Sequence, residues 1–238
     1  MKIRLFTIPN MLTLGNLLCG TSAVVVLLTQ GDFVAAFWLM VASAIFDFFD
    51  GFAARLLKST SAIGVQLDSL ADMVSFGVVP SVALWTLYGT APELTNMSEC
   101  VVNILQYATL IIVAFSALRL AKFNVDDSQH AEFCGLPTPA NGLFCLSMAM
   151  LAVAGEFVLY KEIIILLAVV MAVLLVSPIR MFALKFDGFG WRGNELRYSF
   201  IVFAVAMIVL FTRFAVPAII LAYIVISIVR YAINLCKK

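Results

Sequence analysis

The chain is a succession of long apolar runs separated by short polar connections. A helix that crosses a bilayer needs roughly 20 mostly apolar residues, and the sequence contains eight runs of suitable length. They cover residues 8–30, 33–57, 65–89, 101–121, 140–157, 161–178, 197–213 and 215–235. Runs such as 35–45 and 163–176 are continuously apolar, whereas the strands of a membrane barrel alternate in polarity over about 10 residues. The pattern therefore predicts an all-α, polytopic integral membrane protein with about eight transmembrane helices.

Composition supports this class. Hydrophobic residues make up 63% of the chain, charged residues only 12%, and the mean hydropathy is +1.08, which does not suit a soluble domain. Since the connections are short, we expect residues 1–238 to form a single membrane domain. We expect the lipid bilayer as its surroundings, a homodimer as its assembly, and no nucleic-acid partner.

Two sequence features could suggest other kinds of protein. The first run could mimic a secretory signal, but no A-x-A cleavage site follows it, so we expect residues 8–30 to be a spanning helix. The five cysteines are odd in number and include no C-x-x-C pair. Neither a disulfide framework nor a zinc site is therefore expected.

Lysine and arginine are distributed unevenly between the two sides of the predicted bundle. An even number of helices places both termini on one side, and that side carries thirteen of the fifteen basic residues: Lys2, Arg4, Arg55, Lys58, Arg119, Lys122, Arg180, Lys185, Arg192, Arg197, Arg230, Lys237 and Lys238. Lys161 and Arg213 lie opposite. Because basic residues accumulate in cytoplasmic loops, we expect a multi-pass protein of the cell membrane whose termini and 47–72 segment face the cytoplasm.

Four aspartates stand inside these apolar surroundings, and they are the strongest indication of chemistry. Asp47 and Asp50 lie near the end of the second run, and Asp68 and Asp72 lie at the start of the third. Ionisable groups at membrane depth are costly and are by default functional. Residues three or four apart share a helix face, so two antiparallel helices can direct all four carboxylates into one cavity. Their mutual repulsion then requires cations, and oxygen ligands select Mg²⁺, Mn²⁺ or Ca²⁺.

Small residues and one arginine share this segment. Gly51, Ala54 and Gly64 lack bulk, so they allow close approach of helices and of a large ligand. Arg55 adds a fixed cation that suits phosphate oxygens. The segment 47–72 is thus predicted to be a catalytic motif that spans the end of the second helix and the start of the third.

These residues form the pattern D-x-x-D-G-x-x-A-R, eight further residues, and then G-x-x-x-D-x-x-x-D. The pattern resembles the signature of the CDP-alcohol phosphatidyltransferases, without departure from it. Residues 8–13, 75–80, 118–125 and 135–141 resemble the phosphatidylserine synthase branch of that family, as does the expected number of helices. The resemblance covers roughly residues 5–145, and the remainder matches mainly in hydropathy.

The resemblance implies transfer of the phosphatidyl group from CDP-diacylglycerol to L-serine, with release of CMP. The four aspartates would hold two divalent ions, Mg²⁺ or Mn²⁺, with Ca²⁺ as an alternative occupant. Asp72 would also accept the proton of the serine hydroxyl. Gly51 and Ala54 would line the cytidine pocket, Arg55 would hold the diphosphate, and Gly64 would close the helix turn.

The acceptor is less determined than the donor, because the motif recognises the CDP-lipid and not the alcohol. Glycerol 3-phosphate, inositol or inositol phosphate, and choline are alternatives to serine. Serine would bring a carboxylate to an acidic site, so a cation must meet it, and Arg119 and Lys122 lie on the expected side. A divalent-cation transporter is the competing class of function. It would more often show broken or polar segments at mid-bilayer in both halves, and the acids here lie near one interface.

Overall fold

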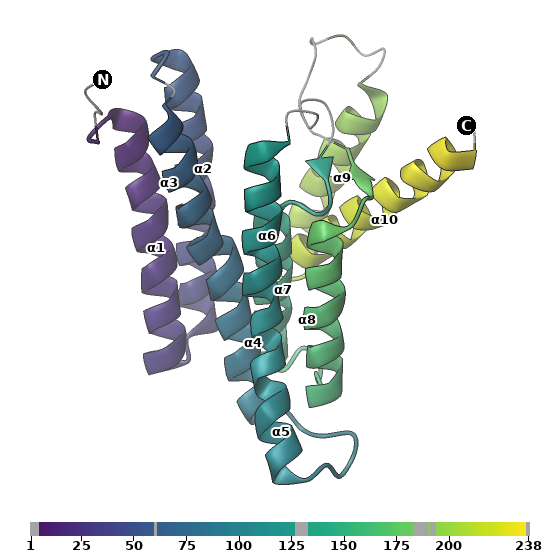
Figure 1. The fold of residues 1–238 in the computed structure, drawn as a ribbon. Coiled ribbons are helices and arrows are strands. Elements are labelled where there is room, and N and C mark those ends of the chain that lie inside the picture. The colour runs from purple at the N-terminus through teal and green to yellow at the C-terminus, as the bar shows by residue number, and fades with distance from the viewer. Residues whose placement is uncertain (1–4, 60, 127–132, 183–189, 191–193, 237–238) are drawn as a thin grey trace.

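The computed structural model describes residues 5–59, 61–126, 133–182, 190 and 194–236. This part of the chain is almost entirely helical (Figure 1). Its helical elements are α1 (Ile8–Gln30), α2 (Phe33–Leu56), α3 (Ala62–Asp72), η1 (Met73–Val78), α4 (Val79–Thr90), α5 (Glu99–Gln106), η2 (Tyr107–Leu110), α6 (Ile111–Val125), α7 (Thr138–Val153), α8 (Lys161–Val176), α9 (Glu195–Phe211) and α10 (Ala215–Cys236). The all-α membrane class predicted from the sequence is confirmed.

Several of these elements join into longer helices. α3, the π-helical turn η1 and α4 run on as one helix of 29 residues, and α5, the 3-10 turn η2 and α6 form another of 27 residues. The described residues thus form eight continuous helices, whose positions are close to those of the eight predicted runs. Five of these helices are long and apolar enough to cross a membrane. The other three, α7, α8 and α9, have 16, 16 and 17 residues.

Local sequence explains where the first helices begin and end. The Asp32 carboxylate accepts a hydrogen bond from the Ala35 backbone N–H at 2.9 Å and so caps α2. The Ser61 hydroxyl accepts one from the Gly64 N–H at 3.1 Å and caps α3. Such caps satisfy backbone donors that a helix leaves free at its start. Gly31, with φ of 63°, ends α1 in the left-handed conformation, which glycine adopts at little cost.

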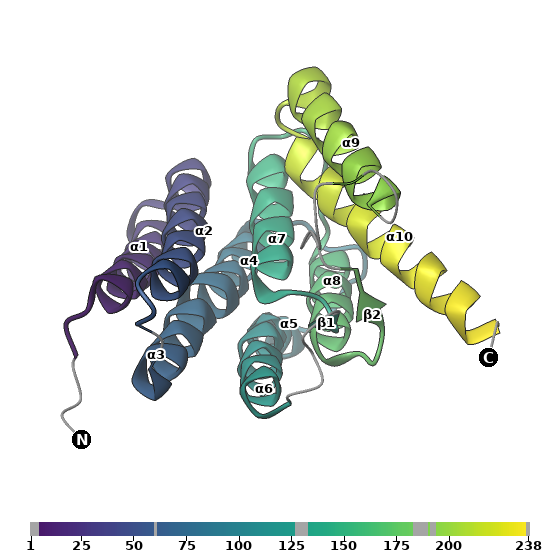
Figure 2. The same cartoon turned by 90° about the horizontal axis from the view of Figure 1, so that it is seen from above.

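The helices are arranged around a central group. Figure 2 shows α1, α2 and α3 on one side, α9 and α10 on the other, and α4, α6, α7 and α8 between them. Fully buried apolar side chains fill this centre, among them Phe76, Leu84, Ile112, Leu146 and Ile164. The acid-bearing helices α2 and α3 therefore rest on a packed core, with α1 against them.

A small antiparallel pair of strands adds to the helical fold. β1 (Phe133–Cys134) pairs with β2 (Arg180–Met181), with Phe133 opposite Met181 and Cys134 opposite Arg180. This pair was not predicted from the sequence. It ties the segment before α7 to the segment after α8. Within the described residues, which include all five cysteines, no disulfide is formed.

The basic residues keep the one-sided distribution that the sequence predicted. Seven of them fall within the described residues, near the end of the bundle where α1 begins and α10 ends (Figure 1): Arg55, Lys58, Arg119, Lys122, Arg180, Arg197 and Arg230. Lys161 begins α8, and Arg213 follows α9, at the opposite end. Lys2, Arg4, Lys185, Arg192, Lys237 and Lys238 lie outside the described residues. Which end faces the cytoplasm stays a prediction.

Candidate active site

The four aspartates come together where the end of α2 lies beside α3. Carboxylate oxygens of Asp47, Asp50 and Asp68 lie within 4.8 Å of one another. Asp72 joins this group through Asp47, which interacts with both Asp68 and Asp72. The helical spacing expected from the sequence therefore brings the four acids into one cluster.

Two of the acids receive hydrogen bonds from α1. The Thr13 hydroxyl donates to Asp50 Oδ2 at 2.6 Å, and Asn16 Nδ2 donates to Asp72 Oδ1 at 3.1 Å. Both donors are buried. Each acid pair thus has one member fixed by the first helix, which lies outside the motif.

Asp68 differs from these two in the surroundings of one oxygen. Its Oδ1 is buried and has no hydrogen-bond partner among the described residues, and a buried polar atom in that condition carries a desolvation penalty. The carboxylates of Asp47 and Asp50 lie close to that of Asp68. A divalent cation would supply the missing partner and offset the repulsion, and hard oxygen donors suit Mg²⁺, Mn²⁺ or Ca²⁺. The residues present therefore fit a metal site.

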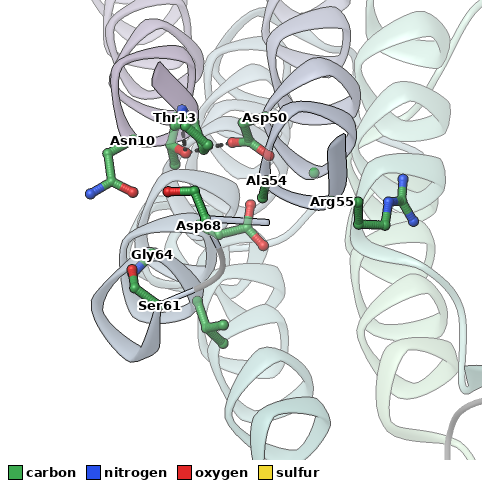
Figure 3. A pocket seen from close by; sticks show the side chains of 12 residues that line it. Asn10, Thr13, Asp50, Ala54, Arg55, Ser61, Gly64 and Asp68 are labelled. Carbon is green, nitrogen blue, oxygen red and sulfur yellow. Dashed lines mark hydrogen bonds between the residues drawn. The ribbon is translucent and has the colours of Figure 1, made fainter. Parts of the chain in front are cut away.

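A pocket of about 230 Å³ opens beside the cluster (Figure 3). Thr13, Asp50 and Asp68 lie toward one another at its inner part, and Ser61 and Gly64 form its α3 side. Its lining residues are Pro9, Asn10, Thr13, Asp50, Gly51, Ala54, Arg55, Ser59, Ser61, Gly64, Val65 and Asp68. The pocket is thus bounded by α1, α2 and α3, with carboxylates at one part of its wall.

The two motif glycines occupy different surroundings in this pocket. A Cβ added to Gly51 would meet no atom of the described residues within 4 Å, so a side chain there would extend into the pocket. A Cβ at Gly64 would lie 3.1 Å from Ser61 Oγ and 3.2 Å from Asn10 Oδ1. Gly51 therefore keeps the pocket open, whereas Gly64 permits the tight cap at the start of α3.

Arg55 lines the rim of the pocket but does not contact the acids. Its side chain is exposed, and its guanidinium extends away from Asp50 and Asp68 (Figure 3). The predicted contact with a diphosphate would require a different rotamer of this long side chain. That role stays a prediction.

The two predicted acceptor contacts have different surroundings. Arg119 is buried on α6, donates from Nη1 to Thr138 Oγ1 at 2.7 Å, and lies near enough to Asp72 for their charges to interact. Its guanidinium carbon also lies 5.6 Å from the centre of the Phe123 ring. Lys122 is exposed, and its Nζ contacts the Cys134 sulfur at 3.7 Å. Arg119 therefore lies beside the acids, whereas Lys122 is directed toward β1.

Sequence reasoning missed the part played by α1. Neither Thr13 nor Asn16 was singled out from the sequence as a partner of the acids. The available signal was the spacing of polar residues on an apolar helix, since Asn10, Thr13 and Asn16 recur every three positions. Residues spaced in this way lie near one face of a helix.

Comparison with known proteins agrees with this geometry. A Helicobacter pylori protein named CDP-diacylglycerol–serine O-phosphatidyltransferase is 32% identical over 180 residues, covering 74% of this chain and 72% of the relative. Proteins of the same name from Bacillus subtilis and Methanocaldococcus jannaschii are 40% identical over 144 residues and 28% identical over 177. The alignments cover 58% and 74% of this chain, and 72% and 74% of those relatives. The family model described as CDP-alcohol phosphatidyltransferase matches residues 6–175, and the chain belongs to that family.

Proposed function

We propose that this protein transfers the phosphatidyl group of CDP-diacylglycerol to the hydroxyl of L-serine, producing phosphatidylserine and CMP. The observation that carries the proposal is the cluster of Asp47, Asp50, Asp68 and Asp72 beside a pocket at one end of an apolar helical bundle. The serine acceptor is supported by the names of the relatives.

The pocket supplies the place for the nucleotide part of the donor. Gly51 and Ala54 form its α2 side and leave room for a cytidine, and Arg55 can reach the diphosphate from the rim. The acyl chains remain in the bilayer, because the pocket lies at the end of helices that span it. An amphiphilic substrate can therefore react without leaving the membrane.

The four aspartates are proposed to hold two divalent ions, Mg²⁺ or Mn²⁺, with Ca²⁺ as an alternative occupant. The partnerless Asp68 Oδ1 and the close approach of three carboxylates support this role. Ions bound there would stabilise negative charge on the attacking and leaving oxygens of a displacement at phosphorus.

Asp72 is proposed to act as the general base. It accepts the proton of the serine hydroxyl while the serine oxygen forms a bond to the phosphorus that carries the diacylglycerol. The bond from that phosphorus to the CMP oxygen breaks, and CMP leaves with the electron pair. No covalent enzyme intermediate is needed. Burial of Asp72 among α1, α3 and α6 limits the approach of water, which would otherwise compete with serine.

The serine carboxylate is proposed to bind Arg119, with Lys122 as a second cation farther out. Arg119 is buried near Asp72, so its guanidinium can hold the carboxylate while the hydroxyl faces the base. Arginine can bind a carboxylate through two parallel hydrogen bonds.

The test is a panel of acceptors. Purified protein is incubated with CDP-diacylglycerol, Mn²⁺ or Mg²⁺, and L-serine, glycerol 3-phosphate, inositol, inositol phosphate or choline, and CMP release and the lipid product are measured. We expect CMP release coupled to phosphatidylserine with serine. Transfer to a different acceptor and not to serine would overturn the acceptor assignment, and no transfer to any acceptor would overturn the proposed function.

We further propose that the protein resides in the cell membrane as a homodimer, with the acids on the cytoplasmic side. Cys236 ends α10 at the acid end, Cys100 lies near the start of α5 at the opposite end, and both are exposed. In single-cysteine variants, a membrane-impermeant maleimide should label Cys100 in intact cells and Cys236 only after permeabilisation. The reverse pattern would contradict the orientation. Crosslinking in native membranes tests the homodimer: a crosslinked product of twice the mass of the chain is expected, and only uncrosslinked chain would contradict it.

A further inference from the structure

Asn16 forms a direct link between α1 and the proposed general base. Its side chain is fully buried, and its Nδ2 donates to Asp72 Oδ1 at 3.1 Å. Asn16 lies outside the 47–72 motif and 56 residues from Asp72 in the chain. The position of the Asp72 carboxylate is thereby linked to α1.

The direction of the Asn16 amide follows from its two partners. An ionised carboxylate can only accept hydrogen bonds, so the amide nitrogen must face Asp72. The amide oxygen then faces Ser75, whose hydroxyl donates to Asn16 Oδ1 at 2.6 Å. A serine hydroxyl has one proton, and this contact is shorter than the one from Ser75 to the Asn16 carbonyl, at 3.1 Å. Ser75 therefore holds the amide in the orientation that donates to Asp72.

Backbone packing fixes Ser75 in this position. Ser75 belongs to the π-helical turn η1, which begins immediately after Asp72, and such turns occur frequently at functional sites. Gly20 lies one helical turn beyond Asn16 on α1, and a Cβ there would come 2.2 Å from Ser75 Oγ and 2.8 Å from its Cα. Only glycine allows α1 to approach η1 so closely. The contact between Asn16 and Ser75 is thus held by two helix backbones.

We propose that Asn16, oriented by Ser75, is a positioning residue that aims the Asp72 carboxylate at the acceptor hydroxyl. This inference rests on the proposed function, since it gives Asn16 a role through the base. It extends the active site to α1 and to η1, neither of which carries a residue of the motif. Its consequence is that Asn16 and Ser75 act on turnover and not on binding of the CDP-lipid.

Ser43 provides a matched control for Ser75. Both hydroxyls are fully buried at the same junction of helices, and Ser43 Oγ lies 3.2 Å from Ser75 Oγ. The shorter contact of Ser43 is its donation to the backbone carbonyl of Asn16 at 2.9 Å, and it makes none to the Asn16 amide group. Ser43→Ala and Ser75→Ala therefore remove the same group from one junction. Only Ser75→Ala releases the Asn16 side chain.

The experiment measures kcat and both KM values for Asn16→Ala, Asn16→Asp, Ser75→Ala and Ser43→Ala with the acceptor that the parent protein uses best. Small misplacements of a reacting group can cost roughly 100-fold in rate, so we expect Asn16→Ala to lower kcat by about 10–100-fold with little change in the CDP-diacylglycerol KM. Asn16→Asp keeps the shape and the bond from Ser75 but places a second carboxylate against Asp72, and it should lower kcat further. Ser75→Ala should lower kcat more than Ser43→Ala.

A double-mutant cycle separates positioning from a merely structural role. If Asn16 acts through Asp72, then Asn16→Ala should cause little additional loss of kcat in an Asp72→Asn background. A full additional loss in that background, or equal losses of kcat for Ser75→Ala and Ser43→Ala, would overturn the positioning role. An increase in the CDP-diacylglycerol KM as large as the loss of kcat would also overturn it. These outcomes can be measured only if the parent protein transfers the phosphatidyl group. If it transfers this group to none of the acceptors, the proposed function itself is overturned.

Discussion

Replacing Arg119 by lysine tests how the acceptor is recognised, because the change keeps the positive charge and removes the planar pair of donors. Arg119 is buried, donates from Nη1 to Thr138, and interacts electrostatically with Asp72. A guanidinium has five N–H donors, so the bond to Thr138 leaves others for a carboxylate. If serine binds there through two hydrogen bonds, a lysine ammonium retains only one of them.

The expected magnitude follows from the loss of that hydrogen bond. A hydrogen bond to a charged group is worth roughly 1.5–3 kcal/mol, and each 1.4 kcal/mol is about tenfold in affinity. We therefore expect Arg119→Lys to raise the serine KM by about 10–100-fold, while the CDP-diacylglycerol KM changes little. Thr138→Val removes the hydroxyl that orients Arg119 and leaves the guanidinium in place. Its effect on the serine KM should have the same direction and be smaller.

The assay is steady-state CMP release with each substrate varied in turn, using L-serine and then ethanolamine, which lacks the carboxylate. The parent protein should favour serine, and Arg119→Lys should reduce the ratio of kcat/KM for serine to that for ethanolamine. The reasoning is refuted if the serine KM is unchanged, or if kcat/KM falls by the same factor for serine and for ethanolamine. In that case Arg119 would serve only as a charge partner of Asp72, a role that lysine can also fill.

Three further predictions concern the metal, the base and the pocket. Chelation with EDTA should abolish CMP release, and Mg²⁺ or Mn²⁺ should restore it; full turnover in the chelator would contradict the metal site. Asp72→Asn should lower kcat by roughly 10²–10⁴-fold, the usual range for loss of a general base, while CDP-diacylglycerol binding remains measurable; near-normal turnover would remove Asp72 from that role. Gly51→Val should raise the CDP-diacylglycerol KM without lowering the thermal unfolding temperature, because its side chain enters open space. Gly20→Ala, which meets the Ser75 backbone, should lower that temperature, and the opposite ranking of the two glycine variants would show that the packing argument is wrong.

The fold was predictable because its main determinants are local. The first run was placed at residues 8–30, and α1 is Ile8–Gln30. Hydropathy over a window of helix length carries this information. The convergence of Asp47, Asp50 and Asp68 was predictable for the same reason, since helical spacing and a short connection determine which faces two neighbouring helices present to each other.

Other features depend on contacts between distant segments, which a single sequence does not reveal. The bond between Ser75 and Asn16 joins residues 59 positions apart. The π-helical turn that carries Ser75 lies inside one of the predicted apolar runs, 65–89, whose pattern did not distinguish it from the rest of the helix. The contact of Lys122 Nζ with the Cys134 sulfur was not apparent from the sequence either. That contact depends on the pairing of β1 with β2, a long-range event between two-residue segments.

The depth of the acids suggests why the base and the acceptor cation come from different helices. Asp50 lies six residues before the end of α2, and Asp72 lies ten residues after the start of α3. At 1.5 Å per residue these positions are about 9 and 15 Å from the helix ends. Asp72 thus lies deeper along α3 than Asp68, which is six residues after the start of that helix. Under the proposed function a serine carboxylate that reaches Asp72 meets a buried cation, and we expect Arg119, six residues before the end of α6, to supply it. Since the proposed donor site lies on α2 and α3 and the proposed acceptor cation on α6, we expect changes at Arg119 to alter the choice of acceptor without altering binding of the CDP-lipid.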